Sequence, residues 1–94
     1  MENWPFDDPP NVAVFTLRQI IKDTEPILLV CHDEDDGAWQ FLTGHPCEEA
    51  DCMIVSLQEI VERDSSLAEL KGLPLGWQAW REAPGRPWQS SPRQ

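Results

Sequence analysis

The apolar residues of this chain are gathered in short runs of four or five residues, and no other feature limits the fold as strongly. The runs occupy residues 12–15, 27–31, 38–42 and 52–55. Runs of this length, rich in β-branched and aromatic residues, are typical of strands. We therefore expect a sheet whose strands are separated by turns and by helices of only a few residues.

The first and fourth runs lead into the same kind of junction. Residues 14–23 align without a gap with residues 54–63. In each copy a hydroxyl residue, Thr16 or Ser56, is followed three positions later by Gln or Glu, which is the capping-box pattern of a helix start. The similarity reflects either a duplicated unit or the shared local rules of strand-to-helix junctions. A further box at residues 66–69 predicts another short helix.

The second and third runs are joined by a polar turn. Asp36 and Gly37 favour the positive φ angles that a tight hairpin turn requires. Residues 38–42 should therefore run back antiparallel to residues 27–31. After a turn at 73–76, residues 77–82 are predicted to form the last strand.

These elements predict one α+β domain. Their order favours a mainly antiparallel sheet of about five strands with two or three short helices packed on one face. A chain of 94 residues is long enough for one modest core. We assign residues 12–83 to this domain, residues 1–11 to a flexible N-terminal arm, and residues 84–94 to an irregular C-terminal tail anchored by Trp88.

The charge balance limits the partners. Seven Lys and Arg residues stand against 17 Asp and Glu residues, which gives a formal charge of −10. Such a chain repels phosphate groups, so we expect neither nucleic acid nor an anionic membrane as a partner. The surplus charge would attract a basic protein surface, or it would only keep the chain soluble.

We expect a cytoplasmic protein. The first residues lack the basic and apolar segments of a secretory signal, and the longest apolar run, 27–31, is too short to cross a bilayer. Three cysteines are an odd number, which in a reducing compartment favours free thiols over a disulfide framework.

The acidic turn at residues 33–36 invites a comparison with calcium loops. A helix-loop-helix calcium site needs a glycine at its sixth position and a glutamate at its twelfth. Here Gly37 is fifth and Gly44 is twelfth. We therefore interpret the turn as a solvated hairpin tip.

Possible zinc or thiol chemistry rests on Cys31, His32, His45, Cys47 and Cys52. The chain has no Cys-x-x-Cys pair, and Cys31 and Cys52 lie inside apolar runs, where a thiol behaves as a small apolar side chain. We expect no metal and no cofactor. The alternative is a small metal-dependent or thiol hydrolase that uses His45, Cys47 and Cys52.

Tryptophans are the most informative aromatic residues. Trp77 and Trp80 have opposite parity on the last predicted strand, so only one of them can face the core. The other either packs under the C-terminal tail or forms a binding anchor with Arg81, because tryptophan and arginine are typical of interface hot spots.

Several segments carry a family resemblance. They are Asp35-Asp36-Gly37-Ala38-Trp39-Gln40-Phe41-Leu42, Val55-Ser56-Leu57 with Ile60, Leu73-Pro74-Leu75-Gly76-Trp77-Gln78-Ala79-Trp80-Arg81, and Pro87-Trp88. Through them the chain resembles, over residues 12–88, a small bacterial family of uncharacterised proteins grouped with candidate immunity proteins of polymorphic toxin systems. The resemblance implies an α+β binding protein that blocks a toxin, and it supplies no catalytic residues.

Together these observations predict a non-enzymatic interaction domain that uses an acidic face to bind a basic protein. A domain that self-associates through an exposed sheet edge is a further hypothesis. The binding residues that we expect are Asp33, Glu34, Asp35, Asp36, Trp77, Trp80 and Arg81.

Overall fold

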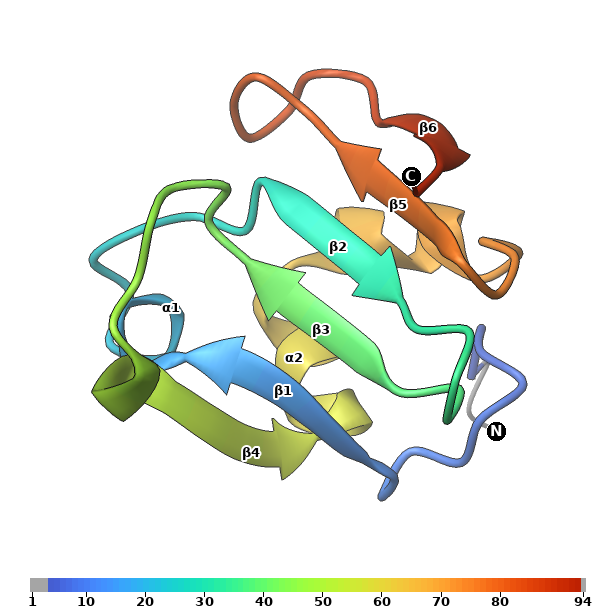
Figure 1. The fold of residues 1–94 in the computed structure, drawn as a ribbon, viewed down its shortest axis with the longest axis horizontal. Helices are drawn as coiled ribbons and strands as arrows, with labels where there is room; N and C mark the ends of the chain where they lie inside the picture. Colours follow the sequence, from blue (N-terminus) through green and yellow to red (C-terminus); the bar gives the residue numbers. More distant parts are fainter. Residues whose placement is uncertain (1–3, 94) are drawn as a thin grey trace.

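In the computed structural model, which describes residues 4–93, six strands form one mixed sheet in the order β4-β1-β3-β2-β5-β6 (Figure 1). β1 and β3 are parallel, and the other neighbouring pairs are antiparallel. The α+β class is thus as predicted, although the sheet is larger than expected and contains a parallel pair. The strands are β1 (Ala13–Leu17), β2 (Leu29–His32), β3 (Trp39–Leu42), β4 (Cys52–Ser56), β5 (Trp77–Trp80) and β6 (Gln89–Pro92).

The helices are short. They are α1 (Arg18–Ile21), α2 (Leu57–Arg63) and the two 3-10 segments η1 (Glu49–Asp51) and η2 (Ser65–Leu70). Figure 1 shows α2 and η2 behind the sheet, so they cover one of its two faces. Within residues 4–93, no helix has the length and apolar character needed to cross a membrane.

The hairpin between the second and third apolar runs is confirmed, with a longer turn than expected. β2 and β3 pair antiparallel, with Val30 opposite Phe41. The turn closes where the amide of Asp33 donates to the carbonyl of Ala38 at 2.8 Å. Gly37 adopts the positive φ, at 72°. Residues 34–37 therefore project from the end of the sheet as a polar loop.

Of the predicted capping boxes, one is confirmed and two are wrong. The hydroxyl of Ser56 accepts from the amide of Glu59 at 3.1 Å and begins α2. The hydroxyl of Thr16 instead donates to the carbonyl of Phe41 at 2.9 Å, because Thr16 lies buried in the middle of the sheet. The η2 segment is capped by Asp64, whose carboxylate accepts from the amide of Ser66.

The core lies between the sheet and the helices behind it. Strand side chains that are almost fully buried, such as Val14 and Phe41, face Leu57, Ile60 and the apolar residues of η2. Burial of this kind of apolar area is the main source of stability in a domain of this size.

The N-terminal segment, expected to be a flexible arm, is packed against the domain from Trp4 onward. Phe6 is only 6% exposed and meets the ring of Trp39 edge to face, with 5.3 Å between centroids. The indole N–H of Trp39 donates to the carboxylate of Asp8 at 2.9 Å. Phe6 therefore belongs to the core; residues 1–3 of the predicted arm lie outside the described residues.

The C-terminal tail, expected to be irregular, contains a strand. β6 pairs antiparallel with β5, from Trp77 opposite Pro92 to Trp80 opposite Gln89. The predicted anchor is confirmed, because Trp88 packs against the core and its indole N–H donates to the hydroxyl of Ser66 at 3.2 Å. Gln94 lies outside the described residues.

Replacing Phe6 with Ala should destabilise the fold, because it leaves a cavity beside Trp39. We expect the free energy of unfolding to fall by about 3 kcal/mol in urea denaturation followed by tryptophan fluorescence. Asp7→Ala is the matched control, since Asp7 is exposed, and should change stability by less than about 0.5 kcal/mol. An unchanged midpoint for Phe6→Ala would show that the segment contributes nothing to the core.

Candidate functional site: an uncovered apolar sheet face with acidic borders

One face of the sheet is turned away from α2 and η2, and in the described part of the chain no helix lies across it (Figure 1). We call it the open face. Successive residues of a strand point to opposite faces, so the strand register identifies the side chains that it carries. They include Cys52, Ile54 and Ser56 of β4, Ala13 and Phe15 of β1, Gln40 and Leu42 of β3, Leu29 and Cys31 of β2, Gln78 and Trp80 of β5, and Gln89 and Ser91 of β6.

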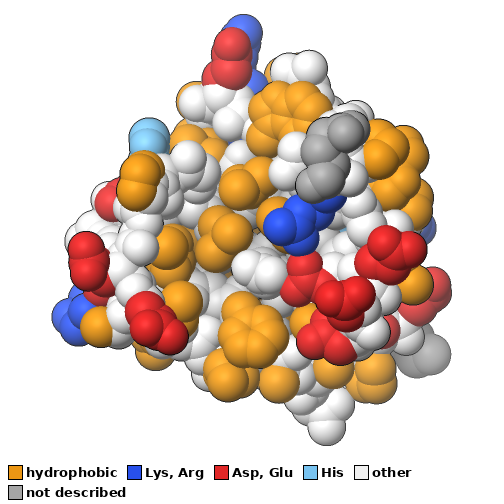
Figure 2. Space-filling view, viewed as in Figure 1, with side chains coloured by type: hydrophobic (Ala, Val, Ile, Leu, Met, Phe, Trp, Pro, Cys, Tyr) orange, Lys and Arg blue, Asp and Glu red, His pale blue; other side chains and the backbone are white. Residues whose placement is uncertain are grey.

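The open face is largely apolar. Phe15 and Ile54 are direct cross-strand neighbours and are 41% and 64% exposed. On the other half of the sheet, Leu29 lies between Leu42 and Trp80. Figure 2 shows hydrophobic side chains spread across the middle of this face. A sheet with one solvated face usually carries polar side chains there, so an apolar area of this extent is unusual for a solvated sheet face.

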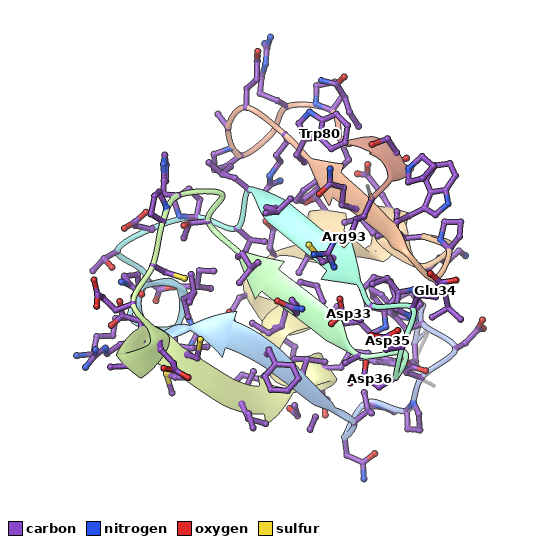
Figure 3. All side chains as sticks on the ribbon, in the orientation of Figure 1. Asp33, Glu34, Asp35, Asp36, Trp80 and Arg93 are labelled. Atoms are coloured by element: carbon purple, nitrogen blue, oxygen red, sulfur yellow. The ribbon has the colours of Figure 1, made fainter. Side chains whose placement is uncertain are left out.

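The acidic tip, Asp33 to Asp36, borders one end of the open face (Figure 3). Asp33 is already engaged, because it accepts from the side chains of Gln40 and Arg93, each at 2.7 Å. Asp36 accepts from the amide of Ala38 at 3.0 Å and so stabilises the turn. Glu34 and Asp35 are exposed and form no ion pair within residues 4–93. Together with Asp36, which is also exposed and has no ion pair in the described residues, they supply the uncompensated negative charge of the tip.

A second acidic group lies near the start of β4, where Glu48 and Glu49 are exposed. Asp51, next to them, is paired with Arg18 and accepts from Gln19, and these hydrogen bonds hold the pKa of Asp51 below its ordinary value. Figure 2 shows acidic side chains on two opposite sides of the apolar area.

A long segment of the sequence around the open face carries acidic residues and no basic ones. Residues 23–62, which include β2, β3 and β4, contain 11 of the 17 acidic residues and no Lys or Arg. One cation reaches this face from the residue after β6, since Arg93 lies across the front of β2 and pairs with Asp33 (Figure 3). The open face thus combines an apolar centre with borders that are mainly acidic, where Arg18 and Arg93 each pair with an aspartate.

The two tryptophans of β5 face opposite sides, as predicted. Trp77 packs against the core, and Trp80 is half-buried on the open face, at the end far from the acidic tip (Figure 3). The C-terminal Trp88 packs on the other side of the sheet with the core. Trp80 is therefore the tryptophan of this strand that a partner can reach.

Arg81 is not a surface residue, which corrects its assignment as a binding anchor. It is 4% exposed, and its guanidinium donates to the carbonyl of Ile27, the hydroxyl of Ser66 and the carboxylate of Asp64. Trp88 stacks on the guanidinium, with its ring centre 4.4 Å away. Arg81 thus holds η2, the C-terminal tail and the start of β2 together.

The carboxylate that pairs with Arg81 is electrostatically perturbed. Partial burial by itself would raise the pKa of Asp64, but hydrogen bonds from Ser66 and Arg81 outweigh burial, so the pKa of this carboxyl lies below its ordinary value. A hollow beside this pair is lined by Arg63 and Asp23, which pair with one another, and by Arg81 and Asp64.

The residues of the hydrolase alternative do not converge. His45, Cys47 and Cys52 are all exposed, and no hydrogen bond joins them in the region covered by the structure. Among residues 4–93, no three His, Cys, Asp or Glu side chains are placed to hold a metal ion. His32 stacks on Trp39 at 3.9 Å between ring centres, and its Nδ1 donates to the carbonyl of Leu73.

The sequence reading identified the acidic tip and Trp80 but missed Phe15 and Ile54. A signal was present, because both lie in runs in which neighbouring residues are apolar, Val14 with Phe15 and Ile54 with Val55. Consecutive apolar residues in a strand place apolar side chains on both faces of the sheet. Because the predicted helices cover only one face, one residue of each pair is expected to be exposed.

Comparison of this chain with protein-family models, with curated proteins and with solved structures found no match. The family resemblance and the toxin-blocking role that it implies therefore stay predictions.

The three thiols should differ in reactivity. Burial raises the pKa of the Cys31 thiol, while Cys47 and Cys52 are exposed. With a disulfide reagent at pH about 8, we expect two thiols to react at least about tenfold faster than the third, because the thiolate is the reactive form. Cys31→Ala should remove only the slow phase. A slow phase that persists in Cys31→Ala would contradict the assignment.

Asp64→Asn should weaken the fold at neutral pH by about 2 kcal/mol, since it removes a charge-assisted hydrogen bond to a buried guanidinium. The folded-state pKa of Asp64 is lowered, so its contribution is present above the ordinary pKa near ~4 and is lost as the pH falls through the folded-state value. Urea denaturation of both proteins as a function of pH should show a gap that narrows toward pH about 2. A gap of constant size would contradict this.

Proposed function

We propose that this protein is a non-enzymatic interaction domain that binds a basic protein through the open face and the acidic tip. The observation that supports this most is the pair Phe15 and Ile54, two large apolar side chains that lie exposed side by side on a sheet bordered by acids. Interfaces typically have an apolar, aromatic centre and a polar rim, and the open face has this composition.

Charge favours a basic partner over a second copy of the chain. Each copy has a formal charge of −10, so two copies that meet at their acidic borders repel one another. A partner with lysine or arginine around an apolar centre would be attracted instead. Such attraction acts mainly on the association rate and weakens as salt is added.

An immunity-like role is one form of this proposal. A domain that covers the basic surface of a toxin would block access to that surface, which accords with the toxin-blocking role implied by the family resemblance. The partner would then be apolar where it meets Phe15, Ile54 and Trp80, and basic around that place.

The proposal is tested by affinity capture from the native host, with the captured protein identified by mass spectrometry and then purified. Phe15→Ser/Ile54→Ser should weaken its affinity by at least about 30-fold, as expected for two residues at an interface centre. The variant loses a cross-strand apolar pair on the open face, so it should stay folded with a free energy of unfolding lower by about 1 kcal/mol. Equal affinity of variant and parent for every captured protein would contradict the proposal.

The electrostatic part of the proposal has a charge-matched control. Glu34→Gln/Asp35→Asn should slow association several-fold at low salt, whereas Glu25→Gln/Glu69→Gln removes the same charge elsewhere, from residues without an ion pair in the described part of the chain, and should have a much smaller effect. The difference between the two variants should disappear at about 1 M salt. Equal effects of both variants would indicate that net charge, and not the acidic tip, directs binding.

A further inference from the structure

We propose that the outer edge of β4 accepts an extended strand from the partner, which continues the sheet beyond β4. This inference rests on the proposed function and names the mode and chemistry of the same interaction. The occupant is a segment with apolar residues at its centre and lysine or arginine at its ends.

β4 is a terminal strand of the sheet. Its inner side pairs with β1, and in the part of the chain that the structure describes no strand pairs with its outer side. Strands at sheet edges present unpaired backbone groups, and binding by strand addition uses such groups.

The register shows which backbone groups point outward. The amide of Leu57 donates to the carbonyl of Val12 at 2.9 Å, and Val55 lies opposite Val14. Alternate residues of an antiparallel strand point their N–H and C=O toward the partner strand, so Met53 and Val55 point toward β1. Cys52, Ile54 and Ser56 therefore point theirs away from the sheet.

Not all of these outward groups are free. The amide of Cys52 donates to the carbonyl of Glu49, and the carbonyl of Ser56, at the N-cap of α2, accepts the first bond of that helix. The groups left to a partner are the carbonyl of Cys52, both groups of Ile54 and the amide of Ser56. These groups can form the backbone hydrogen bonds of a strand that pairs with β4 around Ile54.

The two edges of the sheet differ in protection. β6 is polar, includes Pro92, and is followed by Arg93, all features that discourage edge pairing. β4 has the sequence Cys-Met-Ile-Val-Ser, with no charge, proline or glycine. An unprotected apolar edge beside an exposed apolar face is a place where pairing is favoured.

Acidic residues before and after β4 indicate the charge expected at the two ends of the added strand. Glu48 and Glu49 lie before the strand, and Glu59 and Glu62 follow it in α2, all exposed. An added strand with cations at both ends would approach these acids, of which Glu59 lies 3.8 Å from Arg63 and the other three have no ion pair in the described residues. In a second copy paired symmetrically about Ile54, the acids before one strand would approach those after the other, so self-pairing is disfavoured.

The test uses two libraries of short synthetic peptides, both with β-branched residues at alternate central positions, one with lysine and one with glutamate at both ends. We expect binders from the lysine library, and a change of the Ile54 amide signal in NMR spectra when they bind. N-methylation of the bound peptide at residues of one parity should weaken binding by about tenfold, and methylation at the other parity should not. No binder, or equal effects at both parities, would overturn the inference.

Variants separate this inference from the proposed function. Ile54→Pro removes an outward N–H without removing a bond to β1, and Ile54→Thr keeps that N–H as its matched control. If the captured partner is weakened by Phe15→Ser but binds Ile54→Pro and Ile54→Thr equally, the proposed function stands and strand addition fails. A dimer of the parent protein that Ile54→Pro dissociates would also overturn the inference, because the edge would then serve self-association.

Discussion

In the described residues, helices cover only one face of a six-stranded sheet. This one-sided covering determines where the core lies and which sheet face is exposed. The core forms where α2 and η2 meet strand residues such as Val14 and Phe41. Small domains bury a limited fraction of their surface, so a second layer would need a longer chain. The opposite face stays apolar and uncovered, which is why the sheet itself provides the candidate binding surface.

The arginines form ion pairs within the molecule, and this affects the charge of its surface. Each of the five is paired with a carboxylate: Arg18 with Asp51, Arg63 with Asp23 and Glu59, Arg81 with Asp64, Arg86 with Glu82, and Arg93 with Asp33. Exposed pairs of this kind add little stability, but they leave the remaining acids without internal cations. A partner that neutralises those acids has to bring its own positive charge.

The parts of the fold that could be predicted from the sequence are those encoded by neighbouring residues. The hairpin of β2 and β3 and the Ser56 cap follow from local turn and capping chemistry. The parallel pairing of β1 with β3 and the strand made of Gln-Ser-Ser-Pro depend on partners distant in sequence, and no local pattern indicates them. Arg81 was assigned to the surface for the same reason, because its acceptors Ile27, Asp64 and Ser66 come from other elements. The acidic tip was predictable, whereas Phe15 and Ile54 became candidates only once the position of the helices was known.

The contact between Arg93 and Asp33 joins the end of the described chain to the hairpin tip. Through Arg93 it relates the charge of the tip to the chemistry of a thiol. Arg93 lies in front of β2, the strand that carries the buried thiol of Cys31 (Figure 3). A protease that shortened the chain to Trp88 would remove β6 and this arginine together. The truncated molecule would gain a carboxylate without an ion pair at the tip, and the Cys31 thiol would lose the nearby cation whose charge lowers its pKa, so trimming would alter both the charge and the thiol chemistry of the same surface.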